Sequence, residues 1–290
     1  MALSILERIG HTPLLNINSL NKELGSVKLF AKAEWFNPGG SVKDRAGLWM
    51  IEDAERRGIL HKNKIILESS SGNTGVALAM IGAEKGYQVE LVVPENIHEA
   101  KRKKMEYYGA KLILIPAIDG SDGAFFVAQR MYEENPEAYF LIDQYNNPAN
   151  PQAHYETTGK EILEQTDFRV THFVAGTGTS GTLMGTGKRL KEHNPNTQII
   201  GVQPKESLHG IEGLKNMACS MVPGNYNDSF PDRKIFVPTE SAYEMQKFLL
   251  AEEGLIVGTS AAAASWAALE LAKGLRDAVI VTIFPDGYGE

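Results

Sequence analysis

Short apolar runs alternate with longer amphipathic stretches along most of this 290-residue chain, and this alternation restricts the possible fold more than any other feature. Six runs have the length and composition of buried strands: 64–68, 89–94, 111–116, 171–175, 199–203 and 278–284. Helices are expected between them, over 74–85, 98–108, 121–135, 152–165, 181–193, 241–253 and 260–273. Strands joined through helices pair in parallel, so the predicted fold class is α/β.

The segment Asn-Asn-Pro-Ala-Asn-Pro at 146–151 is the clearest interruption of this pattern, and it separates two series of strand and helix units. The chain is also longer than one compact core usually requires. We therefore expect two open, mostly parallel αβα domains with the active site in the cleft between them. The smaller domain is predicted over 36–146, and the larger one is predicted from 1–35 plus 147–290.

Composition argues against several classes of protein. The net charge of −7 gives no general attraction for nucleic acid, and the basic residues at 101–104 are interpreted as a solvated helix face. No apolar run is long enough to cross a bilayer, and residues 1–10 do not resemble a secretion signal. The one cysteine, Cys219, cannot form an internal disulfide, so a cytoplasmic location is expected.

Cys219 also has no obvious histidine partner, so no thiol chemistry is predicted for it. His154, His172 and His209 lack the spacing of metal ligands and are interpreted as structural or solvated.

Asn37 to Arg45, Asn-Pro-Gly-Gly-Ser-Val-Lys-Asp-Arg, place Lys43 just after a glycine-rich turn that breaks a strand-like run. Ser41 is predicted to cap the helix that follows, which puts Lys43 in its first turn. The positive end of the helix dipole disfavours the ammonium form, so a lowered pKa and a nucleophilic amine are expected. A solvated lysine beside a turn is the alternative.

The loop Gly176-Thr177-Gly178-Thr179-Ser180-Gly181-Thr182 follows a predicted strand and precedes a predicted helix. Inward-turning backbone N–H groups, hydroxyl groups and a helix start together predict a phosphate cradle. The glycine spacing of a dinucleotide site and the lysine of a nucleotide-triphosphate loop are both absent. A purely structural turn is the remaining alternative.

A second polar loop, from Glu68 to Gly75, also joins a strand to a helix and includes Ser70, Ser71, Gly72, Asn73 and Thr74. It is predicted to bind an anion such as a carboxylate, with helix capping as an equal alternative. Ser260, in the segment Gly-Thr-Ser at 258–260, could place a hydroxyl in the cleft, although a capping role is the simpler interpretation.

In this order, the lysine of NPGGSVKDR, the asparagine of SSSGNTG, the loop GTGTSGT and the serine of GTSAAA resemble the cysteine synthase family. Further matches are Ile-Gly-His-Thr-Pro-Leu at 9–14 and Asp-Gln-Tyr-Asn-Asn-Pro at 143–148, so the resemblance spans nearly the whole chain. This family belongs to the pyridoxal phosphate enzymes with the tryptophan synthase β-like fold. Segments 203–206 and 213–217 look closer to its B-type members.

The resemblance implies roles for individual residues. Lys43 would form the internal aldimine with pyridoxal 5'-phosphate, Asn73 would contact the ring hydroxyl oxygen, and Ser260 would meet the pyridine nitrogen. A neutral hydroxyl at that nitrogen suits β-elimination. The residues implied to hold the cofactor phosphate are Gly176, Thr177, Gly178, Thr179, Ser180, Gly181 and Thr182. Those implied to hold the substrate carboxylate are Ser70, Ser71, Gly72, Asn73, Thr74 and Gln144.

The implied reaction is a β-replacement with ping-pong kinetics. O-acetyl-L-serine or O-phospho-L-serine would lose its leaving group to give an aminoacrylate, and sulfide or thiosulfate would then add to form L-cysteine. Lys215 would receive an anionic leaving group or sulfur donor, with a surface charge as the alternative. A homodimer is implied, and serine acetyltransferase or a sulfur-carrier protein are implied as possible partners; no nucleic acid, membrane or metal is expected.

Three alternatives stay open: a cystathionine β-synthase-like enzyme, a serine/threonine dehydratase-like enzyme, and a catalytically silent binding protein on the same fold. The last is suggested because relatives continue for a further short segment beyond Glu290. Loss of that segment is expected to reduce cofactor cover or dimer contact.

Overall fold

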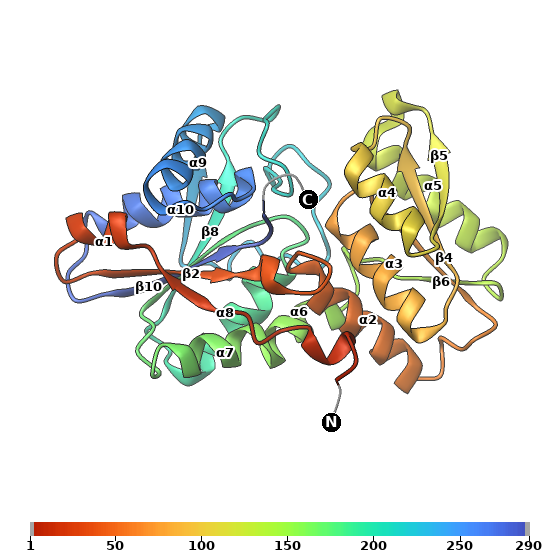
Figure 1. The fold of residues 1–290 in the computed structure, drawn as a ribbon, viewed down its shortest axis with the longest axis horizontal. Coiled ribbons are helices and arrows are strands. Elements are labelled where there is room, and N and C mark those ends of the chain that lie inside the picture. The colour runs from red at the N-terminus through yellow and green to blue at the C-terminus, as the bar shows by residue number, and fades with distance from the viewer. Residues whose placement is uncertain (1–2, 288–290) are drawn as a thin grey trace.

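The computed structural model describes residues 3–287, which form two open sheets side by side, each covered by helices (Figure 1). The α/β class with mostly parallel sheets is therefore confirmed. Among the described residues, no helix is long and apolar enough to span a membrane.

The smaller sheet has four strands in the order β5-β4-β3-β6, and all neighbouring strands are parallel. They are β3 (Ile65–Ser69), β4 (Val89–Pro94), β5 (Lys111–Ile115) and β6 (Tyr139–Leu141). The helices of this part are α2 (Lys43–Arg56), α3 (Asn73–Lys85), α4 (Glu99–Tyr107) and α5 (Gly120–Glu134).

The larger sheet has six strands in the order β1-β2-β10-β7-β8-β9, and only the β1–β2 pair is antiparallel. Its strands are β1 (Leu14–Asn16), β2 (Lys28–Ala33), β7 (His172–Gly176), β8 (Gln198–Pro204), β9 (Arg233–Val237) and β10 (Val279–Phe284). Its helices are α1 (Asn18–Glu23), α6 (Ala149–Glu156), α7 (Thr158–Gln165), α8 (Gly181–His193), α9 (Thr239–Glu253) and α10 (Thr259–Ala272). Short 3-10 helices occupy Leu6–Arg8, Glu34–Phe36 and Ala117–Asp119.

Alternate strand residues enter separate cores on the two faces of each sheet. In β10, Ile280 packs in the core with α9 and α10, whereas its neighbour Val281 packs in the core with α7 and α8. In β3, Ile66 faces α2 and α3, and Leu67 faces α5. Burial on both faces explains why these strands read as continuous apolar runs in the sequence.

A buried ionic cluster joins the start of α2 to the larger sheet. Arg45 donates to the carboxylates of Glu34 and Glu161, at 2.7 Å and 2.6 Å, and the Lys32 amine lies 2.6 Å from Glu161. The side chains of Lys32, Glu34 and Arg45 are fully buried, and that of Glu161 is 12% exposed. Since Arg45 lies two residues after Lys43, the cluster anchors the helix turn that carries the lysine.

The expected elements are present, but five others were not among the predicted ranges: β1, β2, β6, β9 and α1. The helix expected over 152–165 is two helices that meet at Thr157. The four-stranded sheet comes from 65–141, and we propose domain boundaries at 36–146 for the smaller part and 1–35 plus 147–290 for the larger.

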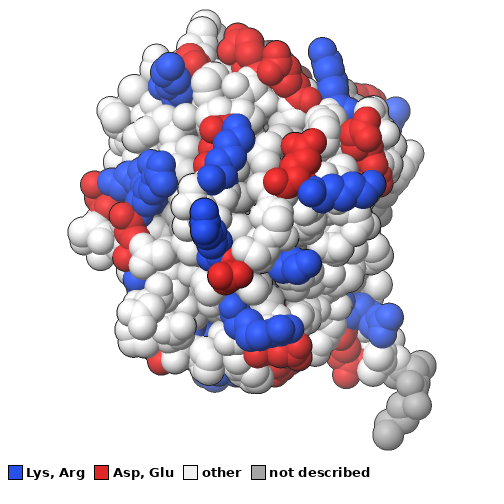
Figure 2. All heavy atoms as spheres, turned by 90° about the vertical axis from the view of Figure 1, so that its left-hand side faces the viewer, with Lys and Arg blue, Asp and Glu red and all other residues white. Residues whose placement is uncertain are grey.

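Charges of both signs are interspersed on the face that lies on the left of Figure 1 (Figure 2). Lysine and arginine side chains there lie next to acidic ones, and neither sign forms a continuous area.

Candidate active site

Lys43 begins α2 and lines a cavity of about 720 Å³ between the two sheets. The helix N-cap is Val42, not the predicted Ser41, although the Ser41 hydroxyl oxygen still accepts the Lys43 N–H at 3.2 Å. The Val42 N–H donates to the Pro285 carbonyl at 2.8 Å, which ties this turn to the segment after β10.

Burial lowers the pKa of Lys43, and the Asp286 carboxylate partly opposes that shift. The direction agrees with the sequence-based expectation, and removal from water is its largest cause. A lysine with a lowered pKa has a larger fraction of free amine at neutral pH, which is the form that attacks an aldehyde.

The cavity brings together several of the predicted site residues. Its wall includes both polar loops, the chain after β6 and one loop of the larger sheet. The predicted residues that line it are Lys43, Ser70, Ser71, Gly72, Asn73, Thr74, Gln144, Gly178, Thr179 and Lys215. Of the other predicted residues, Gly176, Thr177, Ser180, Gly181 and Thr182 do not line it, and Ser260 lines a neighbouring cavity.

The loop after β7 is packed so tightly that glycine is required at two positions. A Cβ on Gly178 would lie 2.3 Å from the Gly213 carbonyl oxygen, and one on Gly181 would lie 1.9 Å from Asn150 Oδ1. Ser180 adopts φ +69°, and its buried hydroxyl has no partner among the described residues. This tight backbone turn at the start of α8, with an unpartnered hydroxyl, fits a bound phosphate.

Three threonine hydroxyls of this loop have protein partners. Thr177 donates to the carbonyl oxygens of Val202 and Lys215, at 3.2 Å and 3.4 Å, so its side chain fixes the loop and does not face the cavity. Thr179 accepts a hydrogen bond from Asn150, and Thr182 pairs with His154 Nε2 at 3.3 Å.

The second polar loop, residues 68–75, is called the serine loop here, and its contacts fit both helix capping and anion binding. Ser70 Oγ accepts the N–H groups of Gly72 and Gly75, at 3.3 Å and 3.2 Å, so this hydroxyl caps α3. Thr74 donates to Gln144 Oε1 at 2.8 Å, which joins the loop to the chain after β6. Ser71 forms no hydrogen bond within residues 3–287. It lines the cavity, so its polar groups are available to a ligand.

Asn73 Nδ2 donates to Asp286 Oδ2 at 2.5 Å across the cleft. Asp286 also forms an isolated β-bridge with Ser41, and its carbonyl oxygen accepts the Gly258 N–H. Asp286, two positions after β10, therefore contacts the lysine turn, the loop that carries Asn73 and the start of α10. No sequence pattern indicated this role, because an Asp after a strand is common in turns.

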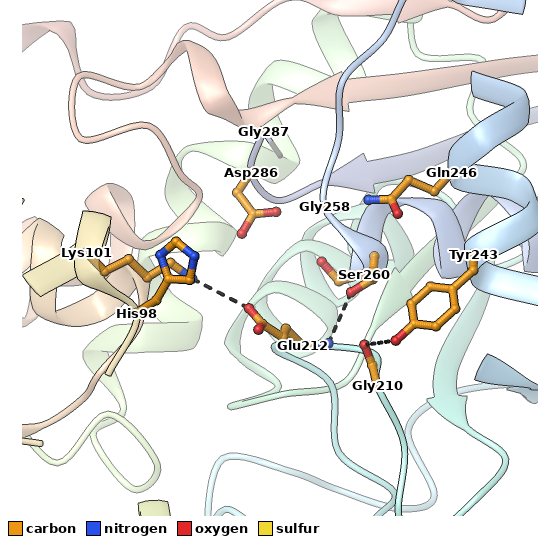
Figure 3. Close-up of a pocket in the computed structure, with 11 residues that line it drawn as sticks. His98, Lys101, Gly210, Glu212, Tyr243, Gln246, Gly258, Ser260, Asp286 and Gly287 are labelled. Atoms are coloured by element: carbon orange, nitrogen blue, oxygen red, sulfur yellow. Dashed lines mark hydrogen bonds and ion pairs between the residues drawn. The ribbon is translucent and has the colours of Figure 1, made fainter. Parts of the chain in front are cut away.

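Ser260 lies in a second cavity of about 510 Å³, close to Asp286 and Gln246 (Figure 3). The N-cap of α10 is Gly258, so the interpretation of Ser260 as a helix cap was wrong. Asp286, His98, Lys101 and Glu212 line both cavities, so the cavity of Ser260 adjoins that of Lys43.

Lys101 was also misinterpreted as part of a solvated helix face. Its side chain is only 13% exposed, and its amine lies 3.7 Å from the Glu212 carboxylate, from α4 to a loop of the larger sheet (Figure 3). The neighbouring Lys103, at 56% exposure, fits the original interpretation. Sequence periodicity identifies a helix face but cannot identify the part of that face that meets another domain.

Among the described residues, no cluster of His, Cys, Asp or Glu could hold a metal ion. His154 is buried between Thr158 and Thr182, and burial lowers its pKa well below the usual value. A neutral His154 is therefore a hydrogen-bond partner of the phosphate-cradle loop. Cys219 lines the larger cavity and is exposed.

Comparison with known proteins agrees with these features. The family model described as "Pyridoxal-phosphate dependent enzyme" matches residues 5–286. The chain belongs to this family. It is 49% identical to a cysteine synthase of Aquifex aeolicus over 290 residues, which covers 98% of this chain and 89% of the relative. It is 41% identical to cysteine synthase B of Escherichia coli, over 98% of this chain and 93% of that one.

A crystal structure of cysteine synthase from Entamoeba histolytica superposes with a TM-score of 0.95 at 35% identity, covering 99% of this chain and 88% of that one. The pyridoxal-phosphate dependence, the fold and the cysteine synthase relationship predicted from the sequence are thereby confirmed.

Proposed function

We propose that this enzyme is a cysteine synthase that replaces the leaving group of an activated L-serine with sulfur. The observation that carries the proposal is the position of Lys43, whose amine faces one cavity together with the serine loop and Gln144. Relatives at 41–49% identity, of which this chain covers 89–93%, are cysteine synthases.

Bound pyridoxal phosphate supplies an aldehyde for amine condensation and an electron-withdrawing ring that acidifies the substrate Cα–H. Lys43 would hold this aldehyde, and Asn73 and Ser260 would lie at its ring. The phosphate would occupy the cradle at 176–182, where Ser180 has an unpartnered hydroxyl.

Ser71, Asn73, Thr74 and Gln144 would hold the substrate carboxylate and so fix the direction of the Cα–H bond. Lys43 Nζ, which lines the same cavity, would also be the group that takes the Cα proton of the bound substrate. Its lowered pKa makes the neutral, proton-accepting form available. The leaving group then departs from Cβ, and a sulfur nucleophile adds at the same carbon.

Lys215 lies where an anionic leaving group or sulfur donor would be recognised. Its amine is 4.9 Å from the centroid of the Tyr145 ring, and it lines the cavity with Asp122. Burial lowers the pKa of Lys215, while the Asp122 carboxylate opposes this shift. We propose that O-phosphoserine or thiosulfate contacts this amine. Lys215→Ala should reduce kcat/KM for O-phosphoserine more than for O-acetylserine, and equal losses would contradict this assignment.

We further propose a homodimer in the cytoplasm, with serine acetyltransferase or a sulfur-carrier protein as possible partners. Size-exclusion chromatography with light scattering tests the dimer.

The central experiment mixes the purified holoenzyme with O-acetylserine and sulfide and measures L-cysteine. Lys43→Ala should abolish both cysteine formation and the borohydride-fixed attachment of the cofactor, whereas Lys103→Ala, an exposed lysine of α4, should change neither. Pyruvate release without cysteine would instead favour a dehydratase, and a silent binding protein would give neither product.

A further inference from the structure

Glu68 is a buried carboxylate at the end of β3 that belongs to none of the roles described so far. Only 2% of the residue is exposed, and it does not line the large cavity. A buried carboxylate is costly unless its oxygens accept hydrogen bonds, so its partners indicate what it does.

The two Glu68 oxygens bind two different loops. Oε1 accepts the Ser69 N–H at 2.9 Å, where the serine loop starts, and Oε2 accepts the Gln144 N–H at 3.2 Å, after β6. These loops are the two halves of the proposed substrate-carboxylate subsite.

Gln144 is held on every side. Its carbonyl oxygen accepts from Asn150 at 2.8 Å and from Asn225 at 3.2 Å, and its side-chain oxygen accepts from Thr74. The preceding residue, Asp143, has φ +50°, a conformation that is costly for a residue other than glycine. This turn directs the Gln144 N–H back toward Glu68, so the Glu68 bond helps to retain a strained backbone.

We infer that Glu68 is a positioning residue that holds the serine loop and Gln144 at a fixed separation, so that both can bind one α-carboxylate of an amino-acid substrate. The inference rests on the proposed function. It adds a residue that touches neither substrate nor cofactor and that sets the width of the subsite.

The arrangement predicts a pH dependence. The pKa of Glu68 is raised to about 7. Burial is the main cause and the nearby Asp143 adds to it, whereas the two backbone hydrogen bonds act in the opposite direction. Tyr145 is the other titratable group that responds to Glu68, and burial and Glu68 raise its pKa to about 12. As the pH falls through about 7, Glu68 should take up a proton; the protonated oxygen then no longer accepts an N–H, and one half of the subsite should be released.

The test compares Glu68→Gln with Glu90→Gln in the holoenzyme. Glu90 is a 7% exposed glutamate of the neighbouring strand β4, bonded to Lys111 and Tyr139, and so is a matched control. Glu68→Gln can accept only one of the two N–H groups. It should raise KM for O-acetylserine, and the apparent Kd for L-serine read from the cofactor absorption, by about tenfold.

Cofactor affinity should stay within about twofold, since the phosphate cradle lies on the other sheet. In the wild type, KM should rise as the pH falls below about 7, and this acid limb of the KM profile should disappear in Glu68→Gln. Glu68→Asp, which is too short to reach both loops, should show an intermediate rise in KM and also serves if Glu68→Gln does not fold.

The inference is overturned if Glu68→Gln and Glu68→Asp bind L-serine as Glu90→Gln does and keep the acid limb. Because L-serine binding is read without turnover, a wild-type enzyme that binds L-serine but makes no cysteine would overturn the proposed reaction and leave the role of Glu68 intact.

Discussion

The buried ionic cluster gives a quantitative prediction for Glu161→Gln. Glu161 is the member that pairs with both Arg45 and Lys32, and those pairs lower its pKa from 4.5 to about 2, against the effect of burial. A shift of this size corresponds to roughly 3 kcal/mol of folding free energy at neutral pH. Removing one partner of a buried pair costs about 3–5 kcal/mol in other proteins, which agrees.

The assay is urea unfolding of the holoenzyme at pH 7, followed by circular dichroism. Glu161→Gln should lose about 3 kcal/mol, and its melting temperature should fall by about 5 °C. Glu164→Gln, at an exposed position of the same helix, is the control and should change by less than about 0.5 kcal/mol.

The pH dependence of this loss has a definite sign. A carboxyl with a lowered pKa stabilises the fold above its unfolded pKa, and this contribution disappears as the pH falls from about 4.5 to about 2. The stability difference between wild type and Glu161→Gln should therefore shrink over that range. A loss at pH 7 of less than about 1 kcal/mol, or a difference that is constant with pH, would refute the reasoning.

Three further predictions concern the cleft. Gly181→Ala should lose bound cofactor, measured by its absorption, because the new methyl would overlap Asn150 Oδ1, whereas Gly274→Ala, with no contact under 3.9 Å, should retain it. His154→Phe removes the partner of Thr182 and should weaken cofactor affinity by about tenfold in a fluorescence titration; unchanged affinity would exclude the contact from phosphate binding. Glu212→Gln should change the unfolding free energy by less than about 0.5 kcal/mol, because the Glu212 side chain is 86% exposed and lies 3.7 Å from Lys101; a larger loss would contradict this.

The main elements of the fold could be predicted from sequence because the central strands are buried on both faces. Strand β4 was expected over 89–94 and has these bounds, and all six of its residues are buried. The missed strands β1 and β6 have three residues each, too few to show a period, and β9 is a half-exposed edge strand. The break at Thr157 has no proline or glycine at the junction itself, and the nearest glycine, Gly159, lies inside α7.

For the site, sequence patterns identified the loops but not the use of each side chain. Ser70 and Thr177 were expected to bind ligand groups, and in the structure their hydroxyls also form hydrogen bonds with the protein backbone. Lys101 and Asp286 come from positions 185 residues apart, and both line the cavities because the chain folds back on itself. The burial that lowers the pKa of Lys43 is likewise a property of tertiary packing, which local sequence does not carry.

The position of β10 has a consequence for synthesis of the protein. This strand, Val279–Phe284, lies between β2 and β7 in the larger sheet, although it is the last strand in the chain. On the ribosome β2 must wait, without a parallel neighbour, until residue 284 has emerged from the exit tunnel. The four strands at 65–141 are contiguous and can assemble much earlier. Because Asp286 lies two residues after β10, the nascent chain cannot complete its vitamin-binding cleft before translation has almost finished.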